Sequence, residues 1–139
     1  MAIHPYPAHL VSCWQLPNGT DLVIRAIRPE DAEMEQTFVR KLSERAKYFR
    51  FMQSINELSP QMLARFTQID YDREIALVAI DEDSPTDNIL GVARIIGDPD
   101  GKTGEFAVLV GDAWQGRGIG GNLLGKCLSI AERQGFETV

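Results

Sequence analysis

The sequence predicts a mixed α/β domain in which a mostly antiparallel sheet is flanked by helices. Two observations carry this prediction. The first half of the chain holds segments with apolar residues at helical spacing, whereas the second half holds three apolar segments of six to eight residues separated by short turns. Strands joined by such short connections pair antiparallel, because a parallel pair needs a crossover of about a dozen residues or more.

The composition indicates one folded domain and excludes several classes of partner. The chain has 139 residues, of which 44% are hydrophobic and 24% charged. We expect no membrane partner and a cytoplasmic location, because neither a long apolar run nor a secretory signal is present. The net charge of −6 argues against nucleic acid. Cys13 and Cys127 are far apart, and the histidines are confined to His4 and His9, so we expect no metal site.

Residues 1–20 are expected to form an N-terminal tail or interdomain linker. Pro5 and Pro7 each push the preceding residue toward extended geometry, which opposes a helix. Residues 16–20 have the composition of a turn. The folded domain is therefore expected to cover residues 21–139.

Three helices are expected to follow a first strand at residues 22–27. The first helix begins with a proline and two acidic residues, which favour a helix N-terminus, and ends near Leu42. A second runs to about Phe51, and a third begins at Ser59. Basic residues gather along the first two helices, and we interpret them as a solvated face, with a phosphate-binding patch as the alternative. They are Arg40, Lys41, Arg45, Lys47 and Arg50.

Three further strands are expected at residues 75–80, 89–96 and 105–110. The acidic, proline-containing segment at residues 81–87 is interpreted as a hairpin connection. Together these strands predict an antiparallel meander. A glycine-rich loop then leads into a helix that is expected to end at Gly135, before the start of one more strand.

The loop at residues 115–121 is the strongest functional signal, with four glycines in its last six positions. Glycines let a backbone approach a ligand closely, and a helix N-terminus favours an anion, so a pyrophosphate is the natural fit. A plain tight turn is the alternative. A dinucleotide fingerprint is also matched at Gly116, Gly118 and Gly121, but that fingerprint normally opens a βαβ unit, whereas the strands here form a meander.

The pattern Gln115-x-x-Gly118-x-Gly120, between a strand and a helix and in this order of elements, resembles the acetyl-CoA motif of the GNAT acyltransferase superfamily. The resemblance implies a GNAT-type sheet and acetyl-CoA as cosubstrate. A closer resemblance is to the acetyltransferase domain of bacterial Pat-type protein-lysine acetyltransferases, which modify acyl-CoA synthetases. It is carried by residues 4–7, 27–31, 48–51 and 66–72.

The resemblance also implies the roles of the site residues. Glu105, at the start of the last strand of the meander, would be the general base for a protein lysine; an ordinary exposed strand glutamate is the alternative. The pantetheine arm would pair with the strand like an added strand, and the pyrophosphate would lie on the loop. The implied cofactor-binding residues are Val108, Leu109, Val110, Gln115, Gly116, Arg117, Gly118, Ile119, Gly120 and Gly121.

Several alternatives stay open. A small-amine acetyltransferase fits the same loop, and so does a non-catalytic acetyl-CoA sensor, which would need no base. Because the family fold continues beyond a position equivalent to Val139, we expect the chain to lack C-terminal elements, including a general acid. We also expect it to form a homo-oligomer through its incomplete sheet.

Three more side chains have a structural and a functional interpretation. Cys127 shares an apolar helical stripe with Leu123 and Leu128, so we expect a buried thiol rather than an acyl-accepting nucleophile. Trp114 is expected to pack beside the loop rather than stack on adenine. Tyr71 is a candidate for the acceptor side, although most aromatic residues at such positions belong to the core.

Overall fold

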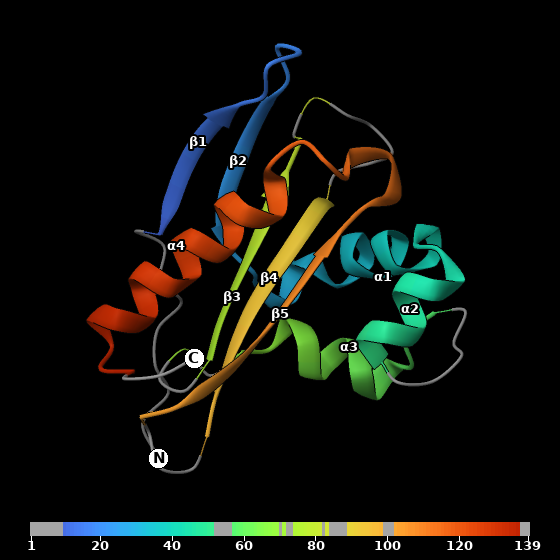
Figure 1. The fold of residues 1–139 in the computed structure, drawn as a ribbon. Coiled ribbons are helices and arrows are strands. Elements are labelled where there is room, and N and C mark those ends of the chain that lie inside the picture. The colour runs from blue at the N-terminus through green and yellow to red at the C-terminus, as the bar shows by residue number, and fades with distance from the viewer. Residues whose placement is uncertain are drawn as a thin grey trace.

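Five antiparallel strands form one sheet, and they lie side by side in the order of the sequence (Figure 1). This computed structural model describes residues 10–51, 57–69, 71, 74–81, 83, 89–98 and 102–136. The strands are β1 (Val11–Gln15), β2 (Asp21–Ala26), β3 (Glu74–Ile80), β4 (Ile89–Gly97) and β5 (Gly104–Val110). The predicted meander of β3, β4 and β5 is confirmed.

Helices cover both faces of this sheet. The helices α1 (Ala32–Lys41), α2 (Glu44–Phe51) and α3 (Pro60–Thr67) connect β2 to β3 on one face, and α4 (Ile119–Arg133) crosses the other face (Figure 1). The predicted fold class is thus confirmed. In the part of the chain that the structure describes, no helix combines the length and the apolar character needed to cross a membrane.

The segment expected to be a tail contributes a strand. Strand β1 pairs with β2, and the Leu16 N–H donates to the Thr20 carbonyl at 2.8 Å to close the hairpin between them. The prediction of a tail over residues 1–20 is therefore wrong from β1 onward. From β1, the half-buried Trp14 packs against the core on the α4 face. Residues 1–9 lie outside the described residues, so an interdomain linker there stays a prediction.

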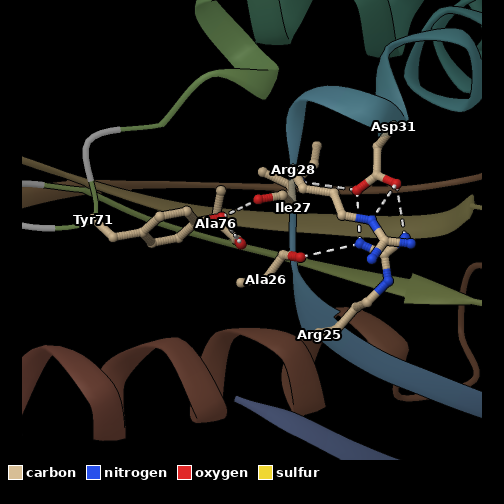
Figure 2. A network of polar contacts seen from close by, with 7 residues as sticks. All are labelled: Arg25, Ala26, Ile27, Arg28, Asp31, Tyr71 and Ala76. Atoms are coloured by element: carbon tan, nitrogen blue, oxygen red, sulfur yellow. Dashed lines mark hydrogen bonds and ion pairs between the residues drawn. The ribbon is translucent and has the colours of Figure 1, made fainter. Parts of the chain in front are cut away.

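A network of hydrogen bonds stabilises the connection between β2 and α1 (Figure 2). The buried Asp31 carboxylate accepts two hydrogen bonds from the Arg25 guanidinium, both at 2.7 Å, and one from the Arg28 N–H at 2.9 Å. The Tyr71 hydroxyl donates to the Ile27 carbonyl. Tyr71 therefore holds the backbone together near this junction, which supports the structural interpretation of that residue.

The α4 face of the sheet is covered by one buried stripe of the helix. Ile119, Leu123, Cys127 and Ala131 recur every four residues and are all buried. The expected burial of the Cys127 thiol is confirmed. The prediction was wrong for Leu128, which is 41% exposed. Among the described residues, no charged side chain is buried beneath α4.

The opposite face buries charge as well as apolar surface. Glu35 and Arg94 are buried there beside apolar residues of α1, α3, β3 and β4, and Lys47 of α2 is buried as well. Lys47 is only 4% exposed, and its ammonium donates to the Arg40 carbonyl at 3.3 Å. The interpretation of the basic residues as a solvated helical face is therefore wrong for Lys47.

Two predicted features fall outside the described residues. The acidic connection between β3 and β4 is described only at positions 81 and 83, and the strand expected after Gly135 is not described beyond Phe136. Self-association through the sheet stays a prediction as well. Sedimentation at several concentrations tests it directly.

Candidate active site

The glycine-rich loop presents backbone N–H groups at the start of α4. Gly116 and Gly118 have φ values of 78° and 84°, in the left-handed region that glycine adopts most readily. The Asn122 N–H donates to the Gly118 carbonyl at 3.0 Å, which is the first bond of the helix. The N–H groups of residues 119–121 precede that bond and have no acceptor within the helix, so they are available to an anion.

Gly120 lets this loop lie directly against β5. A Cβ atom at this position would lie 3.2 Å from the Val110 side chain and 3.3 Å from that of Val108. At the start of the loop, the Gln115 side-chain amide also contacts β5 and donates to the Val110 carbonyl at 3.3 Å. Apart from the neighbouring backbone of the helix itself, no atom of the described residues lies within 4 Å of a Cβ built at Gly121, so this position faces open space.

Two tryptophans border the loop. The Arg117 guanidinium lies 5.1 Å from the centre of the Trp114 ring, and Trp114 itself packs against the core. These contacts support the expectation that Trp114 packs beside the loop. On the other side, Trp14 of β1 reaches within 3.8 Å of a Cβ built at Gly118. Sequence reasoning missed Trp14 because β1 was assigned to a tail. The turn composition of residues 16–20, directly before a predicted strand, is the signal that could have indicated a hairpin.

The far edge of β5 is not paired with any strand in the described part of the chain. The Gly111 N–H donates to the Leu90 carbonyl of β4 at 2.8 Å, which sets the alternation along the strand. By this alternation the backbone groups of Val108 and Val110 face the far edge, and those of Leu109 face β4. Two of the three predicted strand residues thus offer their backbone to a ligand at that edge.

Glu105 lies at the opposite end of β5 from the loop, beside an open groove of about 460 Å³. Its side chain is exposed and shares a face of the sheet with Ala107 and Leu109, the face covered by α1–α3. The groove runs between α2 and β5. It is lined by Ala46, Arg50, Ile96, Glu105, Phe106, Ala107, Val108 and Leu109.

A buried ion pair lies behind this groove. The Arg94 guanidinium contacts the Glu35 carboxylate at 3.2 Å and donates to the Phe66 carbonyl at 2.7 Å. Burial raises the pKa of Glu35, and Arg94 opposes this shift. The guanidinium carbons of Arg94 and Arg50 lie 4.9 and 5.1 Å from the centre of the Phe66 ring. Sequence reasoning missed this cluster, because Glu35 and Arg94 are 59 residues apart.

The geometry brings the predicted site residues together along one strand and the loop that follows it. The seven loop residues lead directly into α4. Val108 and Val110 lie on the edge of β5 that faces away from β4. The open backbone and the left-handed glycines fit the anionic part of a nucleotide-like ligand. Their binding roles, and the role of Glu105 as a base, stay predictions.

A profile of the acetyltransferase (GNAT) family matches residues 33–139 of the chain. Acetyltransferase PA5475 from Pseudomonas aeruginosa is 33% identical over 121 residues, which cover 87% of this chain. The chain spans 65% of the length of that relative.

Solved structures show the same fold. The GNAT domain of S. lividans PAT superposes with a TM-score of 0.82 at 28% identity, covering 95% of this chain and 77% of that one. A cAMP-binding acyltransferase from Mycobacterium smegmatis superposes with a TM-score of 0.58 at 24% identity, covering 93% of this chain and 37% of that one.

Proposed function

The chain belongs to the GNAT acetyltransferase family, and we propose that it transfers an acetyl group from acetyl-CoA to a lysine amine of a protein. The observation that carries this proposal is the arrangement along β5. The anion-binding loop lies at one end of the strand, and Glu105 lies beside an open groove at the other end. The two ends are about 17 Å apart, since each strand residue advances about 3.4 Å.

Acetyl-CoA fits the loop and the edge of β5 that no described strand pairs with. The backbone amides of residues 115–121 would hold its pyrophosphate, and the backbone groups of Val108 and Val110 would bond the amides of its pantetheine arm. The cosubstrate supplies an activated thioester. The chain's part is to fix that thioester near Glu105 while the groove remains open to an acceptor.

Glu105 is proposed as the general base. A lysine amine has a pKa of about 10.4 in water and is therefore mostly protonated near neutral pH. Only the neutral amine attacks a carbonyl carbon, so a nearby group must take a proton. The Glu105 carboxylate lies exposed in the groove, where an incoming lysine can reach it. The amine then attacks the thioester carbon directly, the C–S bond breaks, and CoA leaves as a thiolate that takes up a proton from solvent, so no covalent acyl-enzyme is needed.

The proposed acceptor is a protein, and acyl-CoA synthetases are the proposed class. Support comes from the likeness to the GNAT domain of S. lividans PAT, which has a TM-score of 0.82. The Pat-like segments at residues 27–31 and 66–72 add to it. An open groove suits a side chain presented by a large partner better than an enclosed pocket would.

Calorimetry with CoA and with NAD tests the cofactor. We expect CoA to bind and NAD not to bind. Gly118→Val should abolish CoA binding, because valine tolerates a φ of 84° poorly and would carry methyl groups into the loop. Arg133→Gln, an exposed change at the far end of α4, is the matched control and should leave CoA affinity unchanged. Binding of NAD in place of CoA would overturn the proposal.

Steady-state acetylation of a synthetase acceptor tests the base. Glu105→Gln should lower kcat by roughly 10², because a general base acts in the transition state, and should leave the KM for acetyl-CoA unchanged. Glu132→Gln, an exposed change on α4, is the control. A near-normal kcat in Glu105→Gln would assign the base elsewhere, and a raised KM for acetyl-CoA would mean that Glu105 is structural.

A further inference from the structure

We propose that Gly91 of β4 is a positioning residue for the proposed cosubstrate site. Because Gly91 has no side chain, the first turn of α4 packs directly on β4, and this contact sets the position of the N–H groups that would bind the pyrophosphate. The inference rests on the proposed function, because it concerns the same loop. It is carried by close approaches on two sides of the helix start.

The space above Gly91 is filled by two side chains of α4. A Cβ atom built at Gly91 would lie 3.1 Å from Ile119 Cγ2 and 3.1 Å from Leu123 Cδ1. It would also lie 3.2 Å from the Leu109 carbonyl oxygen of β5. Carbon atoms in favourable contact are about 3.5–4.0 Å apart. Ile119 and Leu123 are both buried in the close-packed core, so a methyl group at position 91 would push the first turn of the helix away from the sheet.

The backbone of Gly91 does not require a glycine. Gly91 pairs with Ala79 of β3, beside a bulge, and with Val110 of β5. Its φ lies outside the left-handed region, so other residues could adopt the same backbone. A glycine inside a strand weakens that strand and often marks the close approach of another element. The packing of α4 therefore accounts for the missing side chain.

The contact at Gly91 acts on the proposed anion site through neighbouring residues. Ile119 is the first residue of α4, and its N–H is one of the three that have no acceptor within the helix. The next residue, Gly120, lies against β5, where a Cβ would be 3.2 Å from the Val110 side chain. Two consecutive residues thus hold the helix start on β4 and against β5. They set the separation of the loop from the strand edge, which one cosubstrate molecule would have to span.

Gly104 offers a matched comparison at the other end of the same sheet face. A Cβ built at Gly104 would lie 3.0 Å from Ile95 Cγ2 and 3.1 Å from Phe136 Cε1, so this position is as crowded as Gly91. Gly104 begins β5, whereas Gly91 pairs with the last residue of that strand, so the two glycines are about 20 Å apart. An alanine should fit poorly at either position, but only the one at position 91 would lie beneath the loop.

The test compares Gly91→Ala with Gly104→Ala by calorimetry with CoA and by urea unfolding. Both variants should unfold at a lower urea concentration than the unchanged chain, because both force a methyl group into filled space. Gly91→Ala should also weaken CoA binding by about tenfold, because the displaced helix start no longer holds the N–H groups in place before the ligand arrives. Gly104→Ala should leave CoA affinity unchanged.

Amide hydrogen exchange without ligand shows which end of α4 is disturbed. In Gly91→Ala, exchange should accelerate about tenfold at the Asn122 N–H, which donates to the Gly118 carbonyl at 3.0 Å. In Gly104→Ala, exchange should accelerate instead at the Phe136 N–H, which donates to a carbonyl near the end of α4 at 3.1 Å. Acceleration at Asn122 in both variants would contradict a local role for Gly91.

The readouts separate this inference from the proposed function. If the unchanged chain binds no CoA, the proposed function fails and the inference fails with it. If the unchanged chain binds CoA and Gly91→Ala binds it equally well, only the inference is overturned. Equal losses of CoA affinity in the two alanine variants also overturn it, because a general loss of stability would then be the cause.

A second pair of variants decides the question if Gly91→Ala fails to fold. Gly91→Ala combined with Leu123→Val is compared with Leu123→Val alone, because valine lacks the Cδ1 atom and makes room for the added methyl group. The conflict with Ile119 remains, so CoA should still bind about tenfold more weakly to the combined variant. Equal CoA affinities in this pair would overturn the inference.

Discussion

The two faces of the sheet are built from the same strands but from different chemistry. Beneath α4, alternate residues of β3 (Ile75, Leu77 and Ala79) meet a buried apolar stripe of one helix. Beneath α1–α3, the intervening residues of β3 are equally apolar, but β4 presents Arg94 to a buried Glu35. One face thus stabilises the fold by burial alone, and the other adds charges that must be paired.

The difference shows where specificity can reside in this molecule. The apolar face seats α4 and so positions the start of that helix against β5, in a way that many apolar side chains would achieve. The charged face is adjacent to the groove that holds Glu105, where we propose that the acceptor binds, and its side chains would set the electrostatic field there. In the proposed function, binding of the cosubstrate would depend on backbone geometry, and binding of the acceptor would depend on side chains.

Removing one partner of the buried ion pair should have the largest effect on stability. Arg94→Met should lower the free energy of unfolding by about 3–5 kcal/mol at neutral pH, because it leaves the Glu35 carboxylate buried without its partner. The loss should shrink as the pH is lowered, since a protonated Glu35 carries no charge. Adding Glu35→Leu to Arg94→Met should recover most of the stability in urea unfolding. A double variant as unstable as the single one would show that the pair is not the cause.

A slightly smaller loss of stability is expected when a buried side chain on the apolar face is shortened and leaves a cavity. Leu123→Ala should lower the free energy of unfolding by about 3 kcal/mol. Leu123 Cδ1 lies 3.1 Å from a Cβ built at Gly91, so the residue opposite has no side chain with which to refill the space. Leu128→Ala on the exposed side of the same helix is the control and should change stability by only about 0.5 kcal/mol. Equal losses in urea unfolding would contradict the assignment of the two helix faces.

The smallest expected effect is a change in the stability contribution of Cys127, on the apolar face, at alkaline pH. Burial raises the pKa of the Cys127 thiol from 9.0 to about 12. Because the folded pKa is above the unfolded one, the stabilisation is complete below pH 9 and is lost as the pH rises toward 12. The stability difference between the unchanged chain and Cys127→Ala should fall by roughly 1 kcal/mol per pH unit above pH 9. A difference that stays constant from neutral pH to pH 11 would mean that the thiol is not desolvated.

The sequence was sufficient for most of the fold, because the information is local. The N-cap of α3 illustrates this: Ser59 accepts from the Met62 N–H at 3.2 Å, as a serine before Pro60 predicts. The loop at residues 115–121 was equally predictable, because four glycines cluster where a helix begins. Strand β1 was missed because neither of its faces is fully buried, so its alternation is weak beside the two prolines that precede it.

The groove beside Glu105 and the buried charges behind it could not be predicted, because the residues that form them come together only in the folded chain. Glu35 carries no mark in the sequence that distinguishes it from the exposed Glu33 on the same helix. In the sequence, Arg50 and its basic neighbours predict a solvated helical face, since a run of charges on helices usually faces solvent. What makes it different is the ring of Phe66 and the approach of β4, both distant in sequence.

The order of the strands allows the sheet to form strand by strand while the chain is synthesised. Each strand pairs with the strand that precedes it in the chain, so the sheet can grow in one direction as a ribosome releases it. No described strand has to wait for a later one to be inserted between two neighbours. Strand β5 is added last of the five, and the loop and α4 follow it. The loop that we propose to bind the cosubstrate would therefore form only after all five strands have been synthesised.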